Sequence, residues 1–201
     1  MKKDRGIVQN ALILFVIALI LSALLGFINQ LTKDTIAAVE LQNKQDAYAA
    51  VYADATFTED EELTALAEQS EEILDEAGYD GIEINEIMLA SGETDGYVLD
   101  ITTSNGYGGD IELSIGVDLD GTLTGLAIIS NSETAGLGAN CTKESFTSQF
   151  AGIQAEQIEY TKTGKTEDYQ IDAITSATIT TTAVTNAVNA GLYFVYEIIG
   201  L

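Results

Sequence analysis

An unbroken uncharged stretch near the N-terminus is the feature that most constrains this chain. Residues 6–32 contain no Asp, Glu, Lys or Arg, and residues 11–27 read ALILFVIALILSALLGF. At about 1.5 Å per residue, a helix over residues 7–31 is long enough to cross a hydrocarbon core of roughly 30 Å. A cleaved signal peptide is the competing interpretation, because a basic segment precedes the run. The run is longer than a usual signal core and lacks a small-x-small site close behind it, so we predict a retained transmembrane helix over residues 7–31.

The flanking charges predict how this helix is oriented. Lys2, Lys3 and Arg5 precede it, whereas the far side begins with Lys33 and continues into an acidic region. The positive-inside rule therefore places residues 1–6 in the cytoplasm and the following domain outside the cell membrane. We therefore expect a single-pass membrane protein that contacts lipid through one helix.

The region after the membrane helix is strongly acidic. From residue 33 onward the chain has 31 acidic residues against 5 basic ones, a formal charge of −26. Such a surface repels nucleic acid, so a nucleic-acid partner is not expected. A solvated acidic surface explains the charge, and attraction of cations is the alternative. The 169 residues are enough to bury a core without disulfides.

Two residue types that commonly carry chemistry are nearly missing. The chain has no histidine, and Cys141 is its one cysteine. These counts exclude an intrachain disulfide, a zinc cluster, a haem-attachment motif and any histidine-based acid–base site. We expect Cys141 to be a small buried side chain. If this protein transfers electrons, its redox group must be a bound cofactor.

The first part of the domain is predicted to be helical. Residues 33–52 are rich in Ala, Gln and Glu and continue the membrane helix as a stalk. Thr58 followed by Glu61 has the spacing of a capping box and predicts a second helix, which Gly78 would end. Residues 32–80 are therefore expected to form a helical stalk and N-terminal helices.

The second part, residues 81–201, changes to a period of two. Alternating apolar side chains predict half-buried strands over residues 84–89, 97–101, 111–117 and 123–130 in a small twisted antiparallel sheet. Residues 157–162 are a further candidate strand. Residues 179–199 carry apolar side chains three or four apart and predict a terminal helix packed on the sheet. The expected fold class is α+β.

The segment that enters this last helix is rich in small and hydroxyl side chains. Residues 172–178 read DAITSAT. Free N–H groups at a helix N-terminus favour a bound phosphate, and small side chains let such a group approach the backbone. Helix capping alone would also explain these threonines and Ser176.

The same segment resembles the D-x-x-(S/T)-(G/S)-A-T signature of FMN-binding domains. The resemblance implies that a flavin transferase joins the FMN phosphate to the hydroxyl of Thr178 as a phosphoester. It makes Asp172 the leading acid of the motif, and Thr175, Ser176 and Ala177 the surrounding loop. Ser176 stands where glycine is commonest, which draws attention to the backbone at that position.

Two further segments resemble the same family and occur in the family's order. The sequence GYGG at residues 106–109 resembles its strand entry and contains Tyr107, for which a core or rim position is the alternative. The sequence SETAGLG at residues 132–138 resembles its ETPGLG loop, with Ala135 in place of proline. In the family this loop lies against the flavin ring. The resemblance therefore implies that the loop shapes the ring pocket and that its polar residues bond ring or ribityl atoms, which gives the candidates Glu133, Thr134, Gly136, Leu137 and Gly138.

Within this family, the length and architecture look most like RnfG of the Rnf ion-translocating electron transport complex, with the related NqrC of the sodium-pumping NADH:quinone reductase as the alternative. The resemblance implies an electron-carrier subunit with covalent FMN, which works with other membrane subunits and needs a flavin transferase for maturation. It would not be a stand-alone enzyme. A free-standing extracytoplasmic carrier and a surface-anchored binding domain without a cofactor remain open as alternatives.

Overall fold

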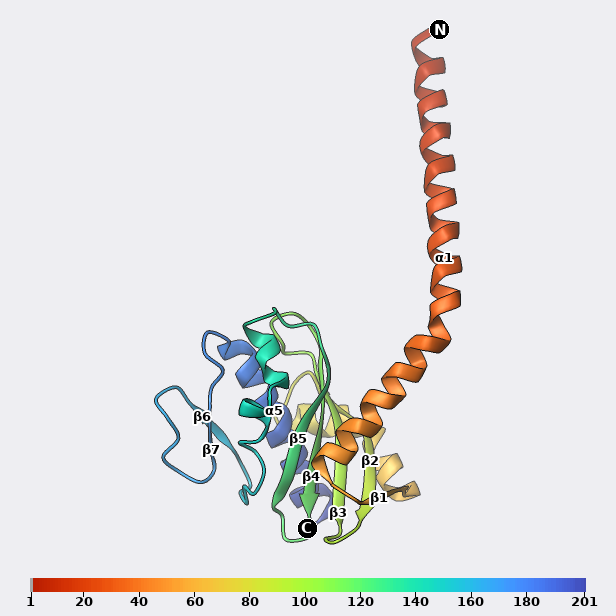
Figure 1. The fold of residues 1–201 in the computed structure, drawn as a ribbon. Coiled ribbons are helices and arrows are strands. Elements are labelled where there is room, and N and C mark those ends of the chain that lie inside the picture. The colour runs from red at the N-terminus through yellow and green to blue at the C-terminus, as the bar shows by residue number, and fades with distance from the viewer. Residues whose placement is uncertain (1) are drawn as a thin grey trace. The chain divides into compact units, whose positions relative to one another are not determined.

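The computed structural model describes the backbone of residues 2–201 and the side chains of residue 7 and residues 9–201 (Figure 1). The predicted cytoplasmic N-terminus, residues 1–6, lies outside the residues whose side chains are described. The chain divides into two compact units, Met1–Asn43 and Lys44–Leu201.

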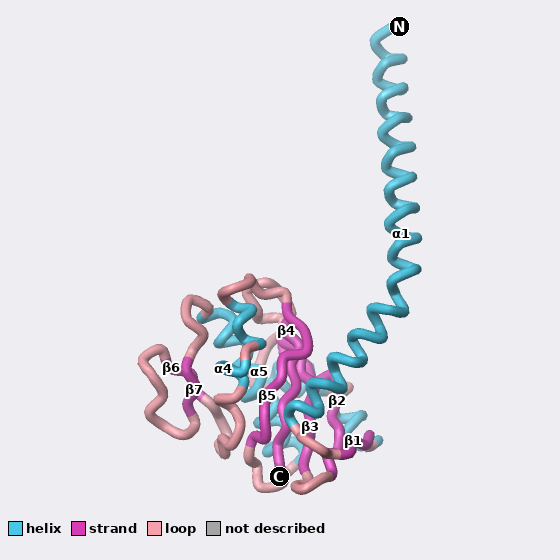
Figure 2. The backbone as a smooth tube through the Cα atoms, viewed as in Figure 1, coloured by secondary structure: helices cyan, strands magenta, loops and turns pink. Residues whose placement is uncertain are grey.

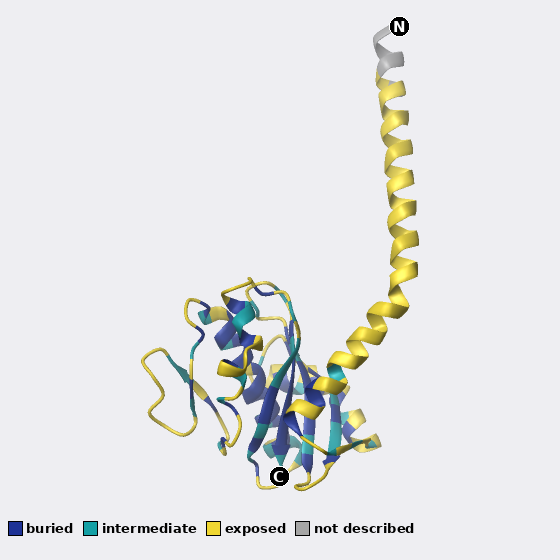
Figure 3. Ribbon diagram, viewed as in Figure 1, coloured by how far each residue is buried: buried dark blue, intermediate teal, exposed yellow. Residues whose placement is uncertain are grey.

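The first unit consists of most of one long helix, α1 (Lys2–Val51). Its described apolar side chains are exposed along the whole uncharged stretch, as Figure 3 shows in yellow. Within the described residues, α1 is the one helix long and apolar enough to cross a membrane. An exposed apolar helix of this length suits a single-pass membrane anchor, since lipid would cover the surface that water does not favour. The predicted helical stalk is continuous with this helix.

The second unit is built on an antiparallel sheet, which confirms the predicted α+β class. In the described part of the chain this sheet has the order β1-β2-β3-β4-β5. The predicted strands are confirmed as β2 (Ile82–Ser91), β3 (Gly96–Thr103), β4 (Ile111–Asp118) and β5 (Leu123–Asn131). Consecutive strands pair as neighbours, because short turns return the chain directly.

The capping box expected at Thr58 was wrong. Thr58 lies in an additional edge strand, β1 (Thr56–Glu59), where it faces Leu89 of β2. The helix begins instead behind Asp60, whose carboxylate accepts hydrogen bonds from the N–H groups of Glu62 and Leu63 at 2.9 and 3.2 Å. The single helix expected here is two short ones, α2 (Glu61–Ala67) and α3 (Ser70–Glu76). Because Thr58 pairs with β2, the residue that caps the helix is Asp60, two residues later.

The candidate strand at residues 157–162 forms, but outside the main sheet. It is β6 (Glu159–Thr161), which pairs in parallel with β7 (Gln170–Asp172) in a small separate sheet (Figure 2). Immediately before β6, the N–H of Ile158 donates to Asn189 Oδ1 of the terminal helix at 2.8 Å. This ribbon delivers the chain to the segment at residues 172–178.

Helical segments cover both faces of the central strands. On one face lies α5 (Thr178–Tyr193), which continues into the π-helical segment η2 (Phe194–Ile199), so the predicted terminal helix is confirmed. On the other face the last turns of α1 pack Tyr48, Val51 and Tyr52 against Val98 of β3. The expectation of half-buried strands was therefore wrong for β3 and β4, which are buried almost throughout (Figure 3).

A partly buried ionic cluster joins the end of α1 to the sheet within the second unit. Lys44 Nζ lies 2.6 Å from Glu86 Oε2 and 2.7 Å from Asp100 Oδ2, and Asp100 is completely buried. The hydroxyl of Tyr48 donates to Glu86 Oε2 at 2.7 Å, and Asn85 Nδ2 donates to Asp100 Oδ1 at 3.0 Å. Since a buried carboxylate needs a compensating charge, Lys44 is expected to determine how firmly this helical end is held.

Candidate functional site

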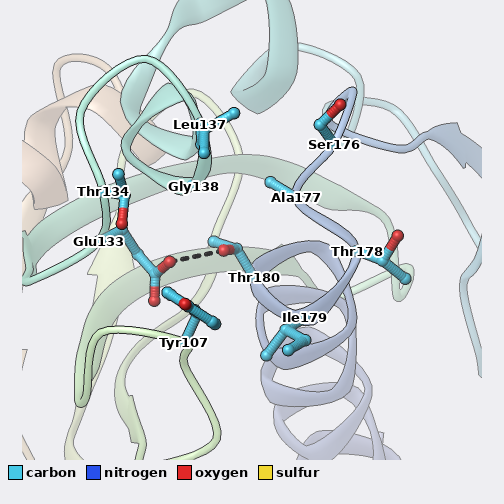
Figure 4. Close-up of a pocket in the computed structure, with 10 residues that line it drawn as sticks. All are labelled: Tyr107, Glu133, Thr134, Leu137, Gly138, Ser176, Ala177, Thr178, Ile179 and Thr180. Atoms are coloured by element: carbon cyan, nitrogen blue, oxygen red, sulfur yellow. Dashed lines mark hydrogen bonds between the residues drawn. The ribbon is translucent and has the colours of Figure 1, made fainter.

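A pocket opens where three segments far apart in the sequence meet (Figure 4). They are the loop at residues 105–110 between β3 and β4, the loop at residues 132–137 after β5, and the entrance to α5. The cavity has a volume of about 530 Å³, which falls within the usual range for small-molecule sites. Its lining residues are Tyr107, Glu133, Thr134, Leu137, Gly138, Ser176, Ala177, Thr178, Ile179 and Thr180.

The rim of this pocket is apolar and exposed. Tyr107, Leu137 and Ile179 are 69%, 44% and 53% exposed, although their side chains are large and hydrophobic. Apolar side chains gathered around a cavity favour a flat, largely apolar ligand, since its binding would remove them from water. The three come from the three different segments, so their meeting is a product of the tertiary fold.

The N-terminus of α5 has no side-chain cap, so its free N–H groups are available to an anion. The helix begins at Thr178 behind Ala177, and no side chain caps it. The first bond from residue i to residue i−4 is made by the N–H of Thr181 to the carbonyl of Ala177 at 3.0 Å. The N–H groups of Thr178, Ile179 and Thr180 therefore lack acceptors inside the helix, and they mark its positive end. The threonines of this turn do not cap the helix, so capping does not account for them.

The loop before the helix is held in one conformation by Thr181. The Thr181 hydroxyl donates to the carbonyl of Ala177 at 2.9 Å and accepts from the N–H of Ile174 at 3.1 Å. Between these two anchors, Ser176 has a φ of 62°, in the left-handed region. This explains why glycine suits the position best, because a side chain there costs about 1 kcal/mol or more.

This geometry predicts that two substitutions of Ser176 differ in their effect on stability. A Ser176→Val change should lower the free energy of unfolding by about 1–2 kcal/mol, because a β-branched residue tolerates positive φ poorly. Ser176→Gly should stay within about 0.5 kcal/mol of wild type, since relief of strain and the added freedom of the unfolded chain offset each other. Urea unfolding of unmodified protein measures both, with the exposed Ser145→Val as the matched control. Equal destabilisation by valine at both positions would contradict this account.

Glu133 lies at the base of the pocket and bonds to the protein itself. It is 9% exposed. Its Oε1 accepts from the N–H of Gly108 at 3.0 Å, and its Oε2 accepts from the hydroxyl of Thr180 at 2.6 Å (Figure 4). The role expected for Glu133, bonding ring or ribityl atoms, thus competes with two bonds already made.

The remaining predicted residues fall into two groups. Tyr107, Thr134, Leu137, Gly138, Ser176, Ala177 and Thr178 line the pocket with Glu133, whereas Asp172, Thr175 and Gly136 are exposed and do not line it. Asp172 ends β7, where its N–H donates to Gln149 Oε1 at 2.7 Å. Gly136 has a φ of 79°, which gives the loop its turn.

Sequence reasoning missed two lining residues, Ile179 and Thr180. Both directly follow the motif, and their spacing from Thr178 gave no sign of which would face the cavity. The predicted burial of Cys141 is confirmed: it is fully buried within η1 (Gly138–Thr142), next to the pocket loop.

Comparison with known proteins agrees with this arrangement. A model of the FMN-binding domain matches residues 106–193, the segment that contributes all three walls of the pocket, and a model of the RnfG N-terminal region matches residues 1–51. The fold and the site thus define a protein in which a single N-terminal apolar helix is followed along the chain by an FMN-binding domain.

Relatives that align with most of this chain identify its family within this class of protein. The G component of the Na⁺-translocating ferredoxin:NAD⁺ oxidoreductase complex from Acetobacterium woodii is 33% identical over 186 residues, covering 90% of this chain and 87% of that protein. The G component of the ion-translocating oxidoreductase complex from Shewanella baltica is 30% identical over 193 residues, covering 93% of this chain and 89% of that protein. The chain belongs to the RnfG family, the G components of ion-translocating oxidoreductase complexes of the Rnf type.

Among solved structures, NqrC of the Na⁺-translocating NADH-quinone reductase from Parabacteroides distasonis is similar, with 26% identity and a TM-score of 0.48. That match covers 54% of this chain and 60% of the other. NqrC from Shewanella oneidensis matches with 19% identity and a TM-score of 0.46, covering 53% of this chain and 54% of the other.

Proposed function

We propose that this chain is the electron-carrier subunit of an Rnf-type membrane complex and that it carries FMN on the hydroxyl of Thr178 through a phosphoester. The observation that supports the proposal most is the position of Thr178. It is the first residue of an uncapped helix and it lines a pocket with an apolar rim. A phosphate at the helix entrance and a ring system in the pocket could then belong to one molecule.

The residues present suit FMN part by part. The free N–H groups of the first turn of α5 suit the phosphate, and the half-buried Thr178 extends away from Glu133 at the entrance, where a transferase can reach it (Figure 4). Tyr107, Leu137 and Ile179 suit the apolar faces of the ring. When bound, FMN supplies one- and two-electron redox chemistry.

In this proposal the bound FMN carries the electrons, and the chain's own residues hold it and tune it. Cys141 is buried and its pKa is raised to about 11 by desolvation and by the charge of Glu133, which keeps the thiol protonated and unreactive at neutral pH. A covalent tether suits an extracytoplasmic domain, since a free cofactor would be lost by dilution there.

Ion movement would then belong to other subunits of the complex. Residues 6–32 contain no charged side chain, so a single helix of this composition offers no path for an ion. In the proposed orientation the N-terminus is cytoplasmic and the acidic domain is outside the cell membrane, with a flavin transferase needed for maturation.

Mass spectrometry of the C-terminal tryptic peptide tests the proposal. Lys165 is the last basic residue, so trypsin releases residues 166–201 as one peptide that contains Thr178. Protein from its native membrane should give this peptide with the added mass of FMN less one water, with fragmentation placing it on Thr178. The peptide of residues 144–162, which has its own threonines, should be unmodified and serves as the control. An unmodified 166–201 peptide would instead favour a binding domain without a cofactor.

Co-purification separates an Rnf-type subunit from a free-standing carrier. The full-length protein, extracted in mild detergent, should bring other membrane subunits with it. A flavin-bearing protein that purifies alone under several detergent conditions would support the free-standing carrier.

A further inference from the structure

Glu133 connects all three walls of the pocket through its two carboxylate oxygens. Its backbone belongs to the loop at residues 132–137, Gly108 donates to it from the second loop, and Thr180 donates to it from the first turn of α5. The side chain is nearly buried, and no Lys or Arg pairs with it among the residues that the structure describes. Both oxygens accept hydrogen bonds, which suits an ionised carboxylate.

Glycines surround this carboxylate where any larger residue would collide with it. A Cβ on Gly138 would meet Glu133 Oε2 and Thr180 Oγ1 well inside contact distance. A Cβ on Gly106 would lie 2.8 Å from Glu133 Oε1, and one on Gly108 would collide with the carbonyl of Ser132. The glycines of the two loops therefore make room for Glu133 and for the close approach of the loops.

The carboxylate also acts electrostatically on its surroundings. Its negative charge contributes, after burial, to the raised pKa of the Cys141 thiol. The same charge lies at the base of a cavity whose other lining residues are uncharged. A fixed negative charge in a poorly solvated site disfavours electrons added nearby.

We propose that Glu133 is a positioning residue with two effects: it locks the three pocket segments together before any flavin is attached, and its charge lowers the redox potential of the flavin. The second effect rests on the proposed function, whereas the first concerns the polypeptide alone. Glu133 acts through Gly108 and Thr180 and is not assigned a bond to the flavin.

The lock is tested on full-length protein made in cells that lack the flavin transferase. Glu133→Gln and Thr180→Val should each lower the Tm of the second unit by roughly 3–6 °C, because each breaks a charge-assisted hydrogen bond across the pocket. Glu144→Gln, at an exposed acid in the first turn of α4 (Glu144–Thr147), is the matched control and should leave the Tm unchanged. Equal Tm values for both pocket variants and the control would overturn the lock.

The charge effect is tested on flavin-bearing protein by redox titration followed by absorbance. Glu133→Gln should raise the ratio of reduced to oxidised flavin about tenfold at a fixed solution potential, a shift of about +30 mV for a two-electron couple. Thr180→Val keeps the charge and should shift the potential less, and Glu144→Gln should not shift it. A Glu133→Gln potential equal to that of Glu144→Gln would overturn the charge effect.

The two tests separate this inference from the proposed function. If Thr178 carries no flavin in wild-type protein, the proposed function and the charge effect fail together. The unfolding measurement needs no flavin, so it decides the lock in either case.

Discussion

Replacing Thr178 with alanine should abolish covalent flavin completely. The phosphoester needs a hydroxyl at the first position of α5, and alanine offers none. Thr178→Ser should retain flavin, at a lower yield if the transferase also reads the methyl group. In-gel fluorescence of the denatured full-length protein measures the result, because only covalently bound flavin survives denaturation.

Thr182→Ala is the matched control for this experiment. Thr182 is also a half-buried threonine of α5, one turn further on, where its hydroxyl donates to the carbonyl of Thr178 at 2.8 Å. It does not line the pocket, so its loss should leave the fluorescence near wild type. A fluorescent Thr178→Ala band would place the attachment elsewhere, and a dark Thr182→Ala band would show that the loss of fluorescence is not specific to Thr178.

The largest loss of stability is expected for Lys44→Met. Methionine keeps the length of the side chain but leaves Asp100 completely buried without its cation. Removing one partner of a buried ion pair costs about 3 kcal/mol, here with some discount because Lys44 and Glu86 are 27% and 30% exposed. The expected result is a Tm lower by roughly 6–12 °C in thermal unfolding of the full-length protein.

This loss should depend on pH in a defined direction. Burial alone would raise the pKa of Glu86, but the bonds from Lys44 and Tyr48 outweigh it and hold that pKa below its ordinary value. Burial alone would lower the pKa of Lys44, but Asp100 and Glu86 raise it above its ordinary value. The contribution of Glu86 is therefore present above the unfolded pKa of a glutamate, about 4.3, and is lost as pH falls through the lower folded value. The contribution of Lys44 is present below about pH 10.4 and is lost as pH rises through its higher folded value.

The difference between wild type and Lys44→Met should accordingly be greatest from about pH 5 to 9 and shrink in stronger acid. The double variant Lys44→Met with Asp100→Asn should recover part of the stability at neutral pH, since it no longer buries an uncompensated charge. A stability difference that is constant from about pH 3 to 9 would show that Lys44 contributes through packing of its aliphatic part alone.

Much of this protein follows from local patterns. The uncharged stretch at residues 6–32 is long enough to predict a membrane helix without reference to the rest of the chain, and the alternation along residues 111–117 predicts a strand because its period is two. The order of the three motifs implied an FMN-binding domain, and the family was confirmed by full-length relatives.

Long-range pairing decided the rest. Thr58 entered an edge strand and not a helix cap, because Leu89 on the neighbouring strand offered it a pairing partner. The second face of β3 is buried because Lys44 and Tyr48 of α1 return to it, a contact that no periodicity within β3 reveals.

The same division applies to the site. Residues 172–178 identified the predicted attachment hydroxyl without reference to the rest of the chain, since the motif is contiguous. Only the folded chain showed that Glu133 is bonded to Gly108 and Thr180, 25 and 47 residues away. Local order determines which backbone conformations are favourable, but which side chains meet depends on closure of long loops, and that is specified by the whole core at once.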